Sequence, residues 1–288
     1  MLAHSVVLSL LLALPAPRAR PEPPPAVERP AATGDEEVLE PPGTGEGDPE
    51  RPRLSVGAPS AAVLAGGAIA LWGDGGVHDP SAAPPRCHWC EPGGFDLWAR
   101  DRLEWREGDV AARASDLLLL GIPLCSAAAL GWLGVREGGS REAIEDVLVI
   151  GAAVALADPL TTRVKEASAR LRPGAWAAGG PRAMGDVHSF VSAHTARVFA
   201  AATAATQVGR LRGRHGWRWV AAVAFGAAAA TGWLRMAADQ HWATDVLAGA
   251  VAGASVGWAV PSLALCRPGE RSRAATLVPA PGGLAVVF

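Results

Sequence analysis

Long apolar runs, separated by short polar segments, fill the second half of the chain. Five of them are long enough to form helices, at residues 113–135, 144–164, 194–209, 217–234 and 243–266. Runs of about 20 apolar residues suit a helix that crosses a bilayer. A sixth run at 55–72 is rich in small residues, and only the terminal "LAVVF" suggests a strand. The pattern predicts an all-α bundle with five to six transmembrane helices. Because several runs are richer in alanine than in leucine, a soluble helical bundle is the alternative interpretation.

The polar connections predict how such a bundle is oriented. The loop after 194–209 contains Arg210, Arg212, Arg214 and Arg218, and the loop after 113–135 contains Arg136 and Arg141. Loops rich in arginine face the cytoplasm under the positive-inside rule. The segments 165–193 and 235–242 are then expected together on the outer, periplasmic side.

The first 112 residues predict an exported N-terminal part of the chain. Residues 1–19 have a short apolar core followed by small residues, as in a signal peptide, although no lysine or arginine precedes the core. Residues 20–53 are proline-rich and acidic, which predicts a disordered linker. If the signal peptide is cleaved, five spans satisfy the loop charges. If 55–72 crosses the membrane, the first segment is not cleaved.

The remaining boundaries follow from the same pattern. Residues 54–112 form an N-terminal exported segment, 113–266 the membrane-embedded domain, and 267–288 a C-terminal tail. Cys87 and Cys90 form a C-x-x-C pair in the exported segment. A local disulfide is the first interpretation of this pair, and part of a metal site is the second, although no further pair of ligands accompanies it.

Charge and composition narrow the class of protein. The net charge of the 288 residues is −2, and no basic run is interleaved with aromatic residues, so a nucleic-acid partner is not expected. Half of the residues are hydrophobic. Lys165 is the only lysine in a chain that otherwise uses arginine. Its neighbours therefore decide what it does.

The first polar cluster is "KEASARLRP", which runs from Lys165 to Pro173. Lys165 and Arg172 are seven residues apart, which predicts that both point from one face of a helix that Pro173 ends. Two cations aimed in one direction suit an anion with several charges, such as phosphate. The alternative is a basic helix end that reaches toward lipid headgroups.

The second cluster is "SFVSAHTA", just before an apolar run. The backbone amides at the start of a helix bind anions, so the amide of Ala193 and the hydroxyl of Ser192 are candidate phosphate donors. His194 beside them titrates near neutral pH and suits a general acid. Taken alone, this motif also fits an ordinary serine cap followed by a polar loop residue.

The third cluster is "RMAADQHWATDVLAG", between two of the most apolar runs. His241 and Asp245 have the spacing of neighbours on one helix face, so the carboxylate is expected to hold one imidazole nitrogen and leave the other free. Arg235 joins them only if the helix breaks near Asp239 and Gln240. The alternative is a solvated loop between two helices.

Together these motifs resemble the type 2 phosphatidic acid phosphatase superfamily, which includes bacterial acid phosphatases and vanadium haloperoxidases. Its motifs are K-x6-R-P, P-S-G-H and S-R-x5-H-x3-D. The first is complete here, from Lys165 to Pro173. The others lose a proline, a glycine and a serine, because Val191, Ala193 and Leu234 stand there, whereas each charged or nucleophilic position is kept.

The resemblance covers about residues 110–266 and implies a helical bundle and a metal-independent phosphatase without a cofactor. His241 would form a phosphohistidine, Asp245 would orient it, and His194 would act as acid and base. The phosphoryl group would be held by Lys165, Arg172, Ser192, Ala193 and Arg235. A phosphorylated lipid or a polyprenyl diphosphate is the expected substrate, at the periplasmic face of an inner membrane.

Three alternatives remain open from the sequence. The same site could belong to a soluble periplasmic acid phosphatase. The degenerate second motif could mark a membrane scaffold that binds phospholipid headgroups without cleaving them. A vanadate-dependent haloperoxidase would share the residues that hold the oxyanion.

Overall fold

The structure is a computed structural model that describes residues 55–56, 86–266, 276–280 and 283–287. The expected signal peptide, the linker and nearly all of the sixth apolar run lie outside the described residues. The chain divides into Met1–Gly47 and Asp48–Phe288, and the described residues all belong to the second unit.

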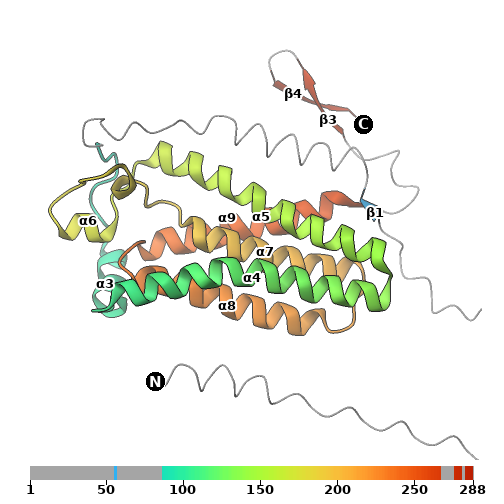
Figure 1. The fold of residues 1–288 in the computed structure, drawn as a ribbon. Coiled ribbons are helices and arrows are strands. Elements are labelled where there is room, and N and C mark those ends of the chain that lie inside the picture. Colours follow the sequence, from blue (N-terminus) through green and yellow to red (C-terminus); the bar gives the residue numbers. More distant parts are fainter. Residues whose placement is uncertain (1–54, 57–85, 267–275, 281–282, 288) are drawn as a thin grey trace, which may run out of the picture. The chain divides into compact units, whose positions relative to one another are not determined.

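Five long helices form the body of the described structure, and they correspond to the five apolar runs (Figure 1). They are α4 (Gly108–Glu137), α5 (Ser140–Ser168), α7 (Ala193–Leu211), α8 (Trp217–Ala237) and α9 (Ala243–Ala264). They lie side by side as an all-α bundle, which confirms the expected fold class. Four of the helices begin or end a few residues beyond the apolar run, because polar residues continue the helix into the connections.

Helix α7 lies at the centre of the bundle and packs against α4, α5, α8 and α9. Most of its buried residues are alanine, whose small side chains let the neighbouring backbones approach closely. Three glycines on α9 extend this contact. A Cβ atom on Gly249 would lie 2.6 Å from the Ser192 carbonyl oxygen, and one on Gly257 would lie 2.5 Å from the Ala200 carbonyl oxygen. A Cβ on Gly253 would collide with the backbone of Ala196.

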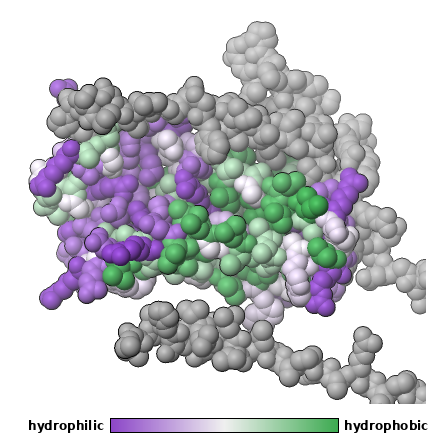
Figure 2. Space-filling view, viewed as in Figure 1, coloured by the Kyte–Doolittle hydropathy of each residue, from purple (hydrophilic) through white to green (hydrophobic). Residues whose placement is uncertain are grey.

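The face of the bundle seen in Figure 2 is apolar in the middle and polar toward both ends. Large apolar side chains point outward from several helices, among them Leu117, Leu120, Leu124, Leu148, Val223, Val251 and Trp258. Among the described residues, α4, α8 and α9 are long and apolar enough to cross a membrane. The length and composition of these three helices support a membrane protein, and the expectation of five to six spans stays a prediction.

Short elements gather at one end of the bundle. Helix α3 (Gly94–Leu103), helix α6 (Pro173–Ala177) and the 3-10 helix η1 (Met184–Val187) lie there (Figure 1).

Two short strand pairs complete the described structure. Strand β1 (Ser55–Val56) pairs antiparallel with β2 (Leu265–Cys266). The terminal hairpin of β3 (Thr276–Ala280) and β4 (Gly283–Val287) agrees with the strand suggested by the last residues.

The opposite end of the bundle is closed by buried ion pairs. Arg212 and Arg214, from the loop between α7 and α8, are 3% and 2% exposed and both bind Asp146 of α5. Glu145 and Glu142 complete the pairs. These two arginines of the expected cytoplasmic loop therefore hold the connection against α5 instead of pointing into solvent.

Candidate functional site

The three polar clusters meet at the end of the bundle where α3 and α6 lie (Figure 1). The C-terminus of α5, the connection from α5 to α7 and the turn from α8 to α9 all reach this end. Each cluster lies at a helix end because the apolar run beside it fills the body of the bundle. Polar side chains that are distant in sequence therefore lie together at this end, next to the apolar middle of the bundle.

Lys165 and Arg172 converge, but not from one helix face as the spacing predicted. Helix α5 ends at Ser168, and Ala169 follows with a positive φ of 40°. Pro173 begins α6 instead of ending α5, since its fixed φ suits the first turn of a helix. The Lys165 ammonium donates to the His188 carbonyl oxygen at 3.0 Å, and an Arg172 nitrogen lies 3.5 Å from the same oxygen.

The second cluster forms the start of α7. Ser192 is its N-cap, and the buried Ser192 hydroxyl accepts from the hydroxyl of Thr195 at 3.0 Å. Ala193 is the first residue of the helix, so its amide is one of those that lack a partner within the helix. His194 follows, and its Nε2 lies 2.9 Å from a carboxylate oxygen of Asp116 on α4.

His241 and Asp245 do not share a helix face, which corrects the prediction. His241 lies in the turn before α9, and Asp245 lies in the first turn of that helix. His241 Nδ1 is 3.6 Å from the carboxylate, an ion-pair distance, and it has no hydrogen-bond partner among the described residues. The Asp245 carboxylate instead accepts from the Ser189 hydroxyl and from the Trp242 amide at 2.9 Å.

The break that Arg235 required is present. Helix α8 ends at Ala237, and Asp239 has a positive φ of 56° in the turn that follows. The side-chain oxygen of Gln240 accepts from Arg172 at 2.7 Å and lies 3.5 Å from an Arg235 nitrogen. One neutral amide thus links two of the expected phosphate ligands.

The electrostatics around His241 show which charges surround it. Burial lowers its pKa well below the usual 6.5, and Arg172, Lys165, Arg235 and His194 lower it further. Four groups that the three motifs contributed therefore act on one imidazole. At neutral pH this imidazole is uncharged, so it has a free electron pair.

Comparison with known proteins agrees with this geometry. The family model of the PAP2 superfamily matches residues 146–265. The chain carries a PAP2 region. The resemblance that the three motifs suggested is confirmed over these residues. No curated protein matches the chain.

One solved structure resembles part of this chain. It is a transmembrane PAP2 type phosphatidylglycerolphosphate phosphatase from Bacillus subtilis, at 18% identity and a TM-score of 0.40. The match covers 58% of this chain and 81% of that chain.

Several polar residues near the PAP2 motifs were not found by sequence reasoning. Asp116 has a visible signal, because it is a charge inside an apolar run. Arg170 lies within the first motif and is 1% exposed, but its spacing from Lys165 did not indicate a role for it. Ser189 stands in the second cluster but was given no role there, and Asp96 has no signal in the sequence. Before the PAP2 region, a disulfide joins Cys87 and Cys90, as the first interpretation of this pair predicted.

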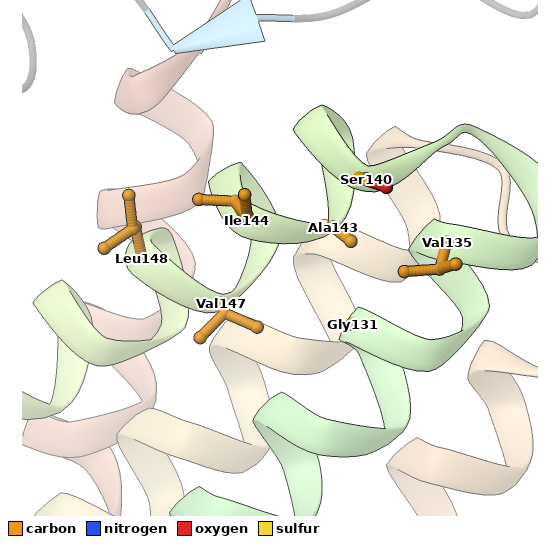
Figure 3. A pocket seen from close by; sticks show the side chains of 7 residues that line it. All are labelled: Gly131, Val135, Ser140, Ala143, Ile144, Val147 and Leu148. Atoms are coloured by element: carbon orange, nitrogen blue, oxygen red, sulfur yellow. The ribbon is translucent and has the colours of Figure 1, made fainter.

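A separate hollow lies between α4 and α5, near the connection of these helices (Figure 3). Its lining is almost wholly apolar and consists of Gly131, Val135, Ser140, Ala143, Ile144, Val147 and Leu148. It holds no charged group, so it does not compete with the polar end of the PAP2 region as a phosphate site.

Proposed function

We propose that this protein is a membrane phosphatase that hydrolyses a phosphomonoester or diphosphate in the headgroup of a lipid, without a metal or other cofactor. The observation that carries the proposal is the convergence of three cations and His194 around the buried, neutral His241. These cations and the two histidines lie at the polar end of the bundle, within the PAP2 region. A lipid headgroup could enter there while its chain stays in the bilayer.

The proposed phosphate ligands supply charge and donors from three directions. Lys165 and Arg172 come from the α5 side, and Arg235 comes from the end of α8. Ser192 and the amide of Ala193 add donors at the positive end of the α7 dipole. Such fixed donors stabilise the charge that develops on phosphoryl oxygens in a transition state.

The proposed reaction has two steps. The Nε2 lone pair of His241 attacks phosphorus, the bond to the leaving oxygen breaks, and His194 gives that oxygen a proton. Water then attacks the phosphohistidine, His194 takes a proton from it, and the bond from phosphorus to His241 breaks. Asp245 lies on the Nδ1 side of His241, which supports Nε2 as the attacking atom.

The position of Asp116 supports His194 as the separate acid. Its carboxylate lies 2.9 Å from His194 Nε2 and 3.7 Å from Arg235, so it links the acid to a phosphate ligand. Burial and the nearby Arg235 lower the pKa of His194 to about 4, which corrects the expected titration near neutral pH. The negative charge of a bound phosphate would raise this pKa again, as general acid catalysis requires. His194 and His241 belong to different helix ends, so each can have its own role.

Substrate class and orientation are part of the proposal. We infer a phosphorylated lipid or polyprenyl diphosphate, hydrolysed at the periplasmic face. Arg136, Arg141, Arg210 and Arg218 near the opposite end support that end as cytoplasmic, although Arg212 and Arg214 are engaged in ion pairs. The catalytic domain would span residues 113–266, after a signal peptide, a linker and the exported segment 54–112.

Phosphate release from lipids in detergent tests this function. The purified protein is expected to release phosphate from at least one of phosphatidate, phosphatidylglycerol phosphate and undecaprenyl diphosphate with EDTA present. A strict requirement for a divalent metal would contradict the mechanism. Binding of these lipids without turnover would favour the scaffold, and halide oxidation that needs vanadate would favour the haloperoxidase.

A further inference from the structure

Asp245 has a second set of contacts, which lies apart from the proposed phosphate ligands. Arg170 donates one nitrogen to the Asp245 carboxylate and, at 2.7 Å, to the hydroxyl of Thr244. Its other terminal nitrogen donates to Asp96 at 2.6 Å. Arg170 is 1% exposed, Asp96 2% and Asp245 0%. One guanidinium is therefore shared by two buried carboxylates.

Asp96 brings the exported segment into this network. It lies on α3, before the PAP2 region, and its carboxylate accepts from the amide and the hydroxyl of Thr244, both at 2.9 Å. Asp245 accepts from the Trp242 amide at the same helix start. Both carboxylates thus bind the first turn of α9, where the helix dipole favours negative charge.

Arg170 is also fixed from its other side. The ring of Trp89 covers the guanidinium, with 3.7 Å between the ring centroid and the guanidinium carbon. The Trp89 carbonyl oxygen accepts from the Leu171 amide at 3.1 Å, and the His88 amide donates to Ala169 at 3.0 Å. The Cys87–Cys90 disulfide closes the loop that carries Trp89. The Trp89 ring and the two backbone hydrogen bonds beside it leave Arg170 little freedom.

We propose that Arg170 is a positioning residue for the nucleophile, and that Asp96 holds it in place. The proposal rests on the proposed function of His241. Arg170 fixes the Asp245 carboxylate beside His241 Nδ1 and balances its charge in a buried site. Without Arg170, two buried carboxylates would face each other, which is costly and makes one of them take up a proton. His241 would then lose its oriented anion.

The variants that test this are Arg170→Gln, Arg170→Lys and Asp96→Asn. The matched control is Arg214→Gln, because Arg214 is also a buried arginine between two carboxylates, at the other end of the bundle. Arg170→Gln is expected to lower kcat roughly 10- to 100-fold with little change in KM, as for other residues that orient a catalytic ligand. Arg170→Lys should recover part of the loss. The control should keep kcat within about threefold even where its Tm falls equally.

A double-mutant cycle shows whether Arg170 acts through Asp245. Arg170→Gln should cost less than about threefold in the Asp245→Asn background, because the contact is already lost. Independent, multiplying losses would overturn the proposal. So would a loss in Arg170→Gln no larger than in Arg214→Gln. If Arg170→Gln does not fold, Asp96→Asn and Trp89→Leu decide by the same comparison.

Binding of inorganic orthovanadate separates this proposal from the proposed function. Vanadate imitates the transition state on an oriented histidine and needs no turnover. Its Kd should rise about tenfold in Arg170→Gln and stay unchanged in Arg214→Gln. A wild-type protein that hydrolyses no phosphate ester would contradict the function, whereas equal vanadate affinity in both variants would contradict the role of Arg170.

Discussion

At the scale of single residues, the two histidines have roles that kinetics can separate. If His241 is the nucleophile, His241→Ala should lose the phosphoenzyme and nearly all turnover, a cost of several kcal/mol in the barrier. His194→Ala should keep phosphoenzyme formation from an aryl phosphate, whose leaving group needs little protonation, and lose about 10²- to 10⁴-fold on a lipid phosphate. Burst kinetics with both substrates measures this.

Each histidine variant has an outcome that would contradict its role. Phosphoprotein that persists in His241→Ala would disprove the nucleophile assignment. Equal losses on the two substrates in His194→Ala would mean that His194 does not protonate the leaving group. His215→Ala is a suitable control, because its side chain is 80% exposed at the other end of the bundle.

The buried imidazole also predicts a pH dependence. Because burial and the neighbouring cations lower the pKa of His241, protonation should begin only below the usual 6.5. Its nucleophilic form should therefore persist into mildly acidic solution. Imidazole NMR of the protein in detergent, with His241→Gln to assign the resonance, measures the midpoint. A midpoint at or above 6.5 would mean that the cations do not surround His241 in solution.

At the scale of elements, the glycine contact between α7 and α9 is testable. Gly253→Ala places a Cβ against the Ala196 backbone, where nothing flexible can move aside. We expect a loss of about 1–3 kcal/mol in stability, together with reduced activity, because the starts of these helices carry His194 and Asp245. Thermal unfolding and phosphate release measure the two effects.

Gly226→Ala on α8 is the matched control. No atom lies within 4 Å of a Cβ at that position, and alanine favours a helix more than glycine does. This variant should be neutral or slightly more stable. If both variants behave alike, the close approach of α7 and α9 does not limit stability.

The sequence predicted the five long helices because their apolar runs are continuous and clearly bounded. It failed where local backbone geometry decides. Seven-residue spacing suggested one helix face for Lys165 and Arg172, yet Ala169 turns the chain and the two side chains converge by another route. The predicted shared helix face of His241 and Asp245 was wrong for a similar reason, because α9 begins after His241.

The sequence also did not predict which residues from distant segments contact the three polar clusters. Asp96 contacts Arg170 and Thr244, and Ser189 donates to Asp245, but no spacing in the sequence predicts these contacts. Asp116 could have been suspected as a charge in an apolar run, but its partner His194 could not. Spacing finds groups that share a motif, and it does not find the residues that orient them.

At the scale of the whole molecule, orientation in the membrane can be measured by labelling. Single cysteines at Ala178, on the side of the proposed site, and at Arg141, at the other end, are both exposed. In a Cys125→Ser, Cys266→Ser background, which leaves only the disulfide-bonded pair, a membrane-impermeant maleimide should label Ala178→Cys in intact cells. Arg141→Cys should react only after permeabilisation, because its loop is expected in the cytoplasm.

The reverse pattern would contradict the periplasmic site. Reaction of both positions in a periplasmic extract without detergent would favour the soluble phosphatase. Cys87 and Cys90 should not interfere, because they are joined in the disulfide.

The glycine contact between α7 and α9 has a consequence for the protein in different lipids. Side chains between two helices can change rotamer and let the helices slide, but glycine offers no such freedom. Bilayers of unequal thickness tilt helices or strain their ends. We expect α4 and α8, with their long outward side chains, to absorb that tilt, while α7 and α9 keep their close contact. The distance between the first turns of α7 and α9 should therefore stay the same when the length of the surrounding acyl chains changes.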